Sequence, residues 1–203
     1  MAGRGRHRRA SVTITGRRLS LADFLDLPEE SPALEYVDGE VIQKVSPKFR
    51  HGLLQTHFVK MVDGFGIPRK LARAAVETRC TFGKSVVPDC VVFTWDRIPT
   101  DEHGEVPDDV TVAPDVAVEI VSPSQSAREQ IERCRWYVEN GVRIALAVDP
   151  QDRDGRSVRA FRADAETPPL RGSDRVDLGD VIPGFSFTVD ELFAALRARW
   201  PAE

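Results

Sequence analysis

The chain has 203 residues, of which 41% are hydrophobic and 30% charged, and its formal net charge is −4. This length fits one domain with a sizeable core, and the negative charge argues against a protein that coats nucleic acid non-specifically. No apolar run approaches the roughly 18 residues of a membrane span, and the three widely spaced cysteines form no disulfide or metal pattern, which predicts reduced thiols in a cytoplasm.

The start of the chain differs from the rest in charge. The first 18 residues contain no acid and six arginines, which are Arg4, Arg6, Arg8, Arg9, Arg17 and Arg18. No apolar segment accompanies them, so the sequence does not predict a signal peptide. We expect residues 1–17 to form a disordered basic arm and residues 18–203 to form a single domain. The arm is either a solvated tail or a segment that contacts phosphates.

The rest of the chain alternates strand patterns with helical patterns. Asp38-Gly39 is a favoured hairpin turn, Ser20 and Thr188 stand at capping-box positions, and Asn140-Gly141 is a helix stop signal. In chain order the predicted elements are a helix at 20–27, a hairpin at 34–45, a helix at 48–63 ended by Gly64 and Gly66, strands at 74–82 and 86–95, an acidic loop at 100–109, a strand at 112–123, a helix from 124–126 to 138, a strand at 142–148, an edge strand at 157–162 and a helix from 188. This order predicts an α/β fold with a central mixed sheet flanked by helices.

Two of the predicted strands begin with Pro-Asp and continue into valines, at Pro88-Asp89 and Pro114-Asp115. The second strand also carries Glu119 within an apolar run, and an ionised carboxylate in a buried strand is costly unless a partner or a metal ion stabilises it. If the two strands are antiparallel neighbours, Asp89 lies across from Glu119. Two such acids can bind Mg²⁺ through oxygen atoms. The alternatives are a turn role for Asp89 and an arginine partner in the core for Glu119.

Motifs for several other chemistries are absent from the sequence. There is no P-loop, GxGxxG, HExxH or GxSxG pattern. The four histidines show no metal-ligand spacing, and His51 and His57 are six residues apart on one predicted helix, which points them to different faces. The acids are therefore the main candidates for a functional site.

The order of several short motifs resembles a known family. The chain resembles the bacterial family called Putative restriction endonuclease, formerly a domain of unknown function, within the PD-(D/E)XK nuclease superfamily. The resemblance covers about residues 18–196. The matching pieces are residues 34–41 (LEYVDGEV), Ser46-Pro47 with His51 shortly after, residues 87–89 (VPD), residues 114–124 (PDVAVEIVSPS), Tyr137, Gly141-Val142, residues 148–150 (VDP) and residues 182–185 (IPGF).

The resemblance implies a restriction-endonuclease-like core and a metal-dependent DNA endonuclease in the cytoplasm. It implies that Asp89 and Glu119 hold Mg²⁺, with Mn²⁺ as a substitute, and that Glu35 joins them from the edge of the pocket. The expected partner is DNA and not a membrane, and a homodimer is an open alternative.

The chain departs from the superfamily motif at one position, because Val121 stands where the motif has lysine. In this family the basic residue looks displaced to the following helix, in a pattern like Asp-x-x-x-Lys that falls on Glu129 and Arg133. An arginine stays protonated, so Arg133 can stabilise charge on a phosphate but is a poor general base. The alternatives are an ordinary Glu129–Arg133 pair at i, i+4, and Lys84 as a substitute cation.

Two classes of function remain open at this point. The first is the Mg²⁺-dependent endonuclease with Asp89, Glu119, Arg133 and Glu35 in its site. The second is a catalytically inactive member of the fold that binds nucleic acid or a protein. The retained acids favour the first class, and the changed lysine favours the second.

Overall fold

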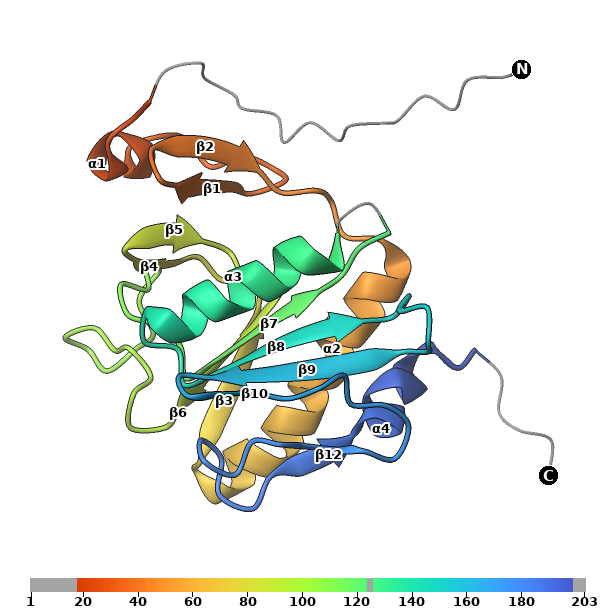
Figure 1. Ribbon diagram of the computed structural model, residues 1–203. Helices are drawn as coiled ribbons and strands as arrows, with labels where there is room; N and C mark the ends of the chain where they lie inside the picture. Colours follow the sequence, from red (N-terminus) through yellow and green to blue (C-terminus); the bar gives the residue numbers. More distant parts are fainter. Residues whose placement is uncertain (1–17, 124–125, 199–203) are drawn as a thin grey trace, which may run out of the picture.

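A six-stranded mixed sheet forms the centre of the computed structural model, which describes residues 18–123 and 126–198 (Figure 1). The strand order is β10-β9-β8-β7-β6-β3. β7 and β8 run parallel, and the other neighbours are antiparallel. The bounds are β3 (Ala72–Val76), β6 (Cys90–Thr94), β7 (Val116–Ile120), β8 (Ile144–Asp149), β9 (Ser157–Arg162) and β10 (Ala165–Glu166).

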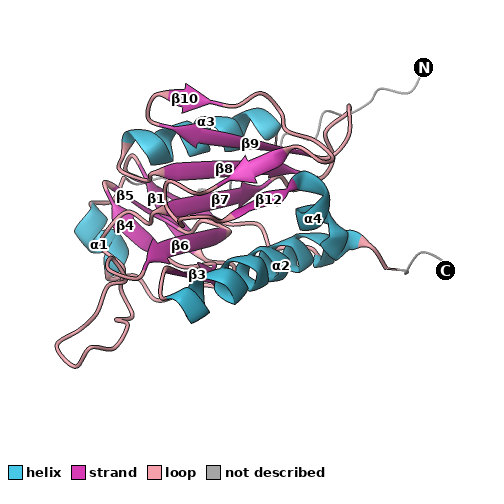
Figure 2. Cartoon of the chain, turned by 90° about the horizontal axis from the view of Figure 1, so that it is seen from below, coloured by secondary structure: helices cyan, strands magenta, loops and turns pink. Residues whose placement is uncertain are grey.

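Helices α2 (Phe49–Gly66) and α3 (Ala127–Glu139) lie on opposite faces of this sheet (Figure 2). β6 and β7 are buried along their whole length, as expected for apolar strands covered on both sides. α3 is the crossover between parallel strands β7 and β8, which cannot be joined by a tight turn. The predicted α/β fold with a central mixed sheet flanked by helices is confirmed.

A second, four-stranded sheet lies on the α3 side, with strand order β2-β1-β5-β4. Its first two strands form the predicted hairpin, in which Asp38 and Gly39 adopt positive φ values of 53° and 90°. Phe82 stacks on Trp136 of α3 with ring centroids 5.4 Å apart, which fixes this sheet against the helix. The strand bounds are β1 (Leu34–Val37), β2 (Glu40–Gln43), β4 (Cys80–Phe82) and β5 (Lys84–Val86).

Short elements complete the two sides of the molecule. α1 (Leu21–Leu25) has the predicted Ser20–Asp23 capping box, and its Phe24 packs on the β1–β2 hairpin. The last helix has the predicted capping box of Thr188 and Glu191. No helix in the described part of the chain is long and apolar enough to span a membrane. The remaining bounds are η1 (Ile67–Arg69), β11 (Arg175–Asp177), β12 (Ser186–Thr188), α4 (Val189–Phe193) and η2 (Ala194–Leu196).

The structure corrects two predicted strands. The segment predicted at 74–82 divides into β3 and β4, which belong to different sheets. The segment predicted at 86–95 contains β6, while its first residue, Val86, ends β5, which begins at Lys84 between the two predicted strands. The first division follows Glu77, whose φ is 48°, and the second surrounds Pro88, which has no N–H for a sheet hydrogen bond. Asp89, one of the acids of the predicted site, therefore lies where the chain passes from the small sheet to the central one.

Two smaller predictions were also wrong. The helix predicted at 48–63, with Gly64 and Gly66 as its stop, passes through Gly64 and ends at Gly66, because one glycine lowers helix stability by only about 1 kcal/mol. A Cβ on Gly66 would lie 2.6 Å from the carbonyl oxygen of Ala72, so the glycine allows close packing on β3. β9 is not the edge of the sheet, because β10 pairs outside it.

Candidate active site

Asp89 and Glu119 come from adjacent antiparallel strands. The register pairs Cys90 with Val118, and one step further along the strands Asp89 lies opposite Glu119. Cross-strand partners point to the same face of a sheet, which here is the face covered by α3. Each residue is only 4% exposed. The N–H of Ile120 donates to Asp89 Oδ2 at 2.7 Å, so the start of β6 is tied to the end of β7.

Arg133 of α3 joins the acids of the two sheets. Its Nε donates to Glu119 Oε1 and to the Tyr137 hydroxyl oxygen, each at 2.7 Å, and Nη1 donates to Glu35 Oε2 at 2.9 Å. Nη2 forms a further ion pair with Glu35 Oε1. Glu35 is buried on β1 and also accepts from the N–H of Val87 at 2.7 Å. One guanidinium therefore positions Glu35 and Glu119 relative to each other.

Two alternatives from the sequence do not describe the structure. Glu129 accepts from the N–H of Ser126 in the capping box of α3. Arg133 forms its ion pairs with Glu35 and Glu119 instead of the predicted i, i+4 pair with Glu129. Lys84 pairs with Asp38 at 2.9 Å and lies over the Trp136 ring, so it does not join the acids.

Asp115, the other acid that follows a proline, has a structural role. Its Oδ2 accepts from the N–H of Thr94 at 2.8 Å, and Oδ1 pairs with Arg97. These bonds tie the start of β7 to the end of β6. The two similar Pro-Asp openings therefore have different roles, and only Asp89 belongs to the acidic group.

Lys44 is a member of the group that the sequence reasoning missed. Its ammonium donates to Asp89 Oδ1 at 3.0 Å, Glu77 Oε2 at 2.8 Å and the carbonyl oxygen of Val87 at 2.7 Å. A signal for it existed in the hairpin. Glu35 pairs with Ile42 across the Asp38-Gly39 turn, and the two-residue period places Lys44 on the same face as Ile42.

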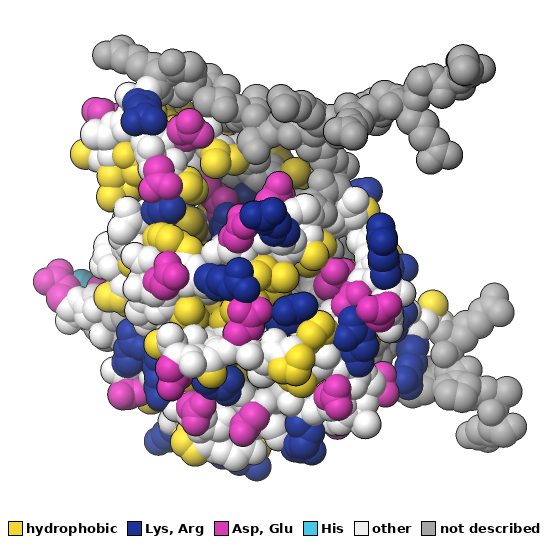
Figure 3. All heavy atoms as spheres, viewed as in Figure 1, with side chains coloured by type: hydrophobic (Ala, Val, Ile, Leu, Met, Phe, Trp, Pro, Cys, Tyr) yellow, Lys and Arg dark blue, Asp and Glu magenta, His cyan; other side chains and the backbone are white. Residues whose placement is uncertain are grey.

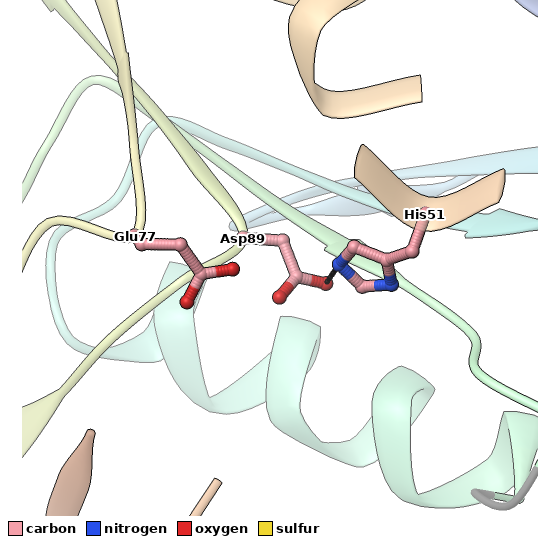
Figure 4. A group of neighbouring side chains, drawn as sticks. All are labelled: His51, Glu77 and Asp89. Carbon is pink, nitrogen blue, oxygen red and sulfur yellow. Dashed lines mark ion pairs between the residues drawn. The ribbon is translucent and has the colours of Figure 1, made fainter. Parts of the chain in front are cut away.

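His51 and Glu77 were also missed as site residues, although His51 was part of the family resemblance. The His51 ring and the Glu77 carboxylate lie on either side of Asp89 (Figure 4). His51 Nε2 is 3.3 Å from Asp89 Oδ2, without the geometry of a hydrogen bond, and Nδ1 is 3.4 Å from Ser122 Oγ. Gln55 of α2 donates to Glu77 Oε1 at 2.5 Å and orients that carboxylate.

The cluster has a strong electrostatic asymmetry. Burial alone would raise the pKa of Asp89, but His51, Lys44 and the Ile120 N–H lower it to about 2. Burial raises the pKa of Glu119 to about 7, because Arg133 and Lys44 offset only part of the effect and Asp89 and Glu35 add to it. Burial would lower the pKa of Lys44, but Asp89, Glu119, Glu77 and Glu35 raise it overall. For Glu35, Arg133 and Lys44 outweigh burial, and the pKa is lowered.

The acids outnumber the cations that hold them. The carboxylates of Glu35, Glu77, Asp89 and Glu119 contact two fixed cations, Lys44 and Arg133. Glu77 is partly exposed, and the other three carboxylates are buried. Buried charge without full compensation is unfavourable, so the excess is relieved by a proton on Glu119, whose pKa is raised, or by a further cation. Asp89 and Glu119 offer the oxygen ligands that Mg²⁺ prefers.

A pocket of about 300 Å³ adjoins the acids at the start of α2. Two of its lining residues, Lys48 and Arg50, are basic and exposed. On the face drawn in Figure 3, by contrast, Lys and Arg are interspersed with Asp and Glu, and no continuous basic surface is seen. The full lining is Lys48, Arg50, His51, Ile120, Val121, Ser122, Pro123, Pro150 and Gln151.

Comparison with known proteins shows a family match and a similar solved structure. Residues 21–190 match the family described as Putative restriction endonuclease (Uma2). The structure is similar to the crystal structure of a putative nuclease belonging to DUF820 from Anabaena variabilis ATCC 29413, with a TM-score of 0.82 and 34% sequence identity. That similarity covers 88% of this chain and 99% of the other. No curated protein matches the chain.

Proposed function

Because the chain belongs to the Putative restriction endonuclease family, we propose that it is a metal-dependent DNA endonuclease that hydrolyses phosphodiester bonds. The observation that carries the proposal is the cross-strand pair Asp89–Glu119, buried beside an excess of negative charge. The residues fit Mg²⁺, or Mn²⁺ in its place, because both side chains offer carboxylate oxygens on one face of the sheet. The ion would supply Lewis acidity at the scissile phosphate.

The other residues act on the position and charge of these acids. Arg133 fixes the orientation of Glu119 and Glu35 and adds positive charge close to where the phosphate would bind. The ammonium of Lys44 donates to Asp89 Oδ1 and holds that carboxylate in place. Val121 has no proton to exchange, and Arg133 is held protonated by two carboxylates, so neither replaces the motif lysine as a general base.

The start of α2 is the proposed contact with the DNA backbone. Lys48 and Arg50 line the pocket next to the acids, and basic side chains there can bind phosphates independently of sequence. Phe49 lies between them and is 83% exposed. An exposed aromatic ring between two cations is suited to stacking on an unpaired base.

The proposal is tested with supercoiled, linear and single-stranded DNA in the presence of Mg²⁺, Mn²⁺ or EDTA. Wild-type protein should cleave at least one form with a divalent ion. Asp89→Asn and Glu119→Gln should lower cleavage to the level of the EDTA control. Asp108→Asn, which changes an exposed acid in the 100–109 loop, is the matched control and should cleave normally.

A second candidate function is a non-catalytic DNA-binding module, favoured by Val121 in place of the motif lysine. If the wild type is inert with both ions on every DNA form but still binds DNA, the endonuclease proposal is wrong and the binding function replaces it.

A further inference from the structure

We propose that His51, Glu77 and Asp89 form a second cation position, separate from the Asp89–Glu119 pair, that binds a first-row transition-metal ion. Asp89 belongs both to this position and to the Asp89–Glu119 pair, and this shared residue is the only part of the proposed function on which the inference rests. It assigns ligand roles to His51 and Glu77.

Three elements bring the ligands together. His51 lies in the first turn of α2, Glu77 follows β3, and Asp89 precedes β6. One ligand atom from each side chain lies within 4.8 Å of the others, and Figure 4 shows Glu77 and His51 flanking Asp89. Two ligands of one small ion are at most about 4.2 Å apart, since each bond is about 2.1 Å long, so small side-chain rotations would suffice.

The His51 ring is the independent sign of a ligand. The residue is 8% exposed, and Nε2 is buried and makes no hydrogen bond among the described residues. Its contact there is the ion pair with Asp89 Oδ2 at 3.3 Å that Figure 4 shows. Buried polar atoms are nearly always hydrogen-bonded, so an atom of this kind calls for an explanation. Ser122 Oγ lies 3.4 Å from Nδ1, which leaves Nε2 directed at Asp89. A metal ion bound to Nε2 would satisfy it.

The ammonium of Lys44 marks the same place as a position for a cation. It lies between Glu77 and Asp89 and contacts three oxygen atoms, two from carboxylates and one from the Val87 carbonyl group. A divalent ion that binds the two acids would displace this ammonium. The flexible four-carbon stem of lysine allows that movement. Lys44 is therefore a competitor for the ion.

The ligand set indicates the class of ion. Mg²⁺ prefers oxygen ligands, whereas an imidazole nitrogen favours transition-metal ions. One nitrogen and two carboxylates should therefore bind Mn²⁺, and later first-row ions more tightly still, in preference to Mg²⁺.

Electron spin-echo spectroscopy of the full chain loaded with Mn²⁺, without DNA, tests the proposal. The wild type should show coupling of Mn²⁺ to a ¹⁴N nucleus, because His51 ligates the ion. This readout needs no variant, so misfolding of a variant cannot hide it. Absence of ¹⁴N coupling at saturating Mn²⁺ would overturn the proposal.

Variants assign the signal to these residues. His51→Ala should abolish the ¹⁴N coupling. His57→Ala changes a half-buried histidine of the same helix, whose Nε2 lies 3.0 Å from the carbonyl oxygen of Glu191, and should keep the coupling. Glu77→Gln should weaken Mn²⁺ binding by about tenfold or more in calorimetry. Lys44→Met should strengthen it, and an unchanged or weaker affinity would show that the ion binds elsewhere.

The remaining variant separates the two positions. Glu119→Gln should keep the ¹⁴N coupling. If the coupling is lost in Glu119→Gln but kept in Glu77→Gln, the ion binds at the Asp89–Glu119 pair instead. None of these measurements uses cleavage. A protein inert on DNA that shows the coupling refutes the proposed function alone, and an active protein without the coupling refutes this inference alone.

Discussion

Arg133 stabilises the relative position of the two sheets through buried charge. Its guanidinium contacts Glu119 of the main sheet and Glu35 of the small sheet, and all three side chains are largely removed from solvent. Removing one partner of such a group leaves buried charges uncompensated, which is far more costly than losing a surface ion pair. The residue is therefore structural as well as a candidate for the site.

Arg133→Ala should lower the free energy of unfolding by about 3–5 kcal/mol, because Glu35 and Glu119 would lose their shared counterion. Arg133→Lys should lower it less, since it keeps the charge without the planar fork. Urea unfolding measures both. Arg128→Ala, which breaks the exposed i, i+4 pair with Glu132, is the control and should change stability by no more than about 0.5 kcal/mol. A similar small effect at position 133 would contradict the structural role.

The same substitutions bear on activity. We expect Arg133→Ala to lose cleavage while metal binding is largely kept, and Arg133→Lys to keep cleavage. Ordinary cleavage by folded Arg133→Ala would exclude Arg133 from the reaction.

Glu119 should make stability depend on pH. Its pKa is raised from 4.5 to about 7. Between these values the folded state keeps a proton that the unfolded state has released, so the free energy of unfolding should fall as pH rises through this window. The total effect is on the order of 3 kcal/mol. Asp89, whose pKa is lowered, makes the free energy of unfolding rise with pH, but it does so at lower pH, below this window.

Urea unfolding of the metal-free protein between pH 4.5 and pH 7.5 measures this effect. Glu119→Gln has no carboxyl to titrate and should flatten the decline. Glu132→Gln, at an exposed position of α3, should leave the decline in place. Equal slopes in the wild type and Glu119→Gln would show that Glu119 does not carry the pH dependence.

At the scale of elements, the start of α2 connects the acids to the surface. Its first turn carries His51 toward Asp89, while Lys48 and Arg50 line the neighbouring pocket and Phe49 extends into solvent. One helix end thus combines a buried polar contact with a basic, aromatic surface.

Phe49→Ala should weaken binding to single-stranded DNA by about 1–3 kcal/mol, because a stacked base would lose its partner. Binding to intact duplex should change little, since its bases are already stacked. Fluorescence anisotropy with oligonucleotides of both kinds measures the difference. Val106→Ala, at another exposed apolar residue, is the control. Equal losses on both DNA forms would argue against stacking.

At the scale of the whole molecule, charge is divided between the basic start of the chain and the acidic remainder. The arm predicted at residues 1–17 lies outside the residues that the structure describes. Its role on DNA therefore stays a prediction. The mixed charge on the face in Figure 3 gives that prediction weight, because this face offers no continuous basic surface for the DNA backbone.

Deletion of residues 1–17 should weaken DNA binding at low salt by removing arginines that neutralise phosphates. The slope of log K against log salt should become shallower by about 0.9 for each lost phosphate contact on duplex DNA. Binding titrations at several salt concentrations measure the slope. If the affinity and the slope are unchanged by the deletion, the segment is only a tail.

Local patterns in the sequence determined most of the elements and one pairing at the site. Helical and strand periodicities, the Asp38-Gly39 turn and the capping boxes identify the elements, because these signals depend on neighbours within a few residues. The buried acids in two apolar strands predicted that Asp89 would face Glu119, and the register agrees. The same periodicity could not locate the breaks after Glu77 and around Pro88, because these depend on which sheet each half joins.

Only the tertiary structure decided which cations and further ligands surround the acids. Lys44, Glu77 and His51 come from a hairpin, a strand end and a helix. The hairpin period relates Lys44 to Glu35, but no spacing in the sequence relates any of the three to Asp89. The structure also gave Arg133 its partners, since the side chain contacts residues 98 and 14 positions away rather than Glu129. The physical reason is that a buried charge is stabilised by whichever opposite charges the packed elements bring near it, whatever their distance along the chain.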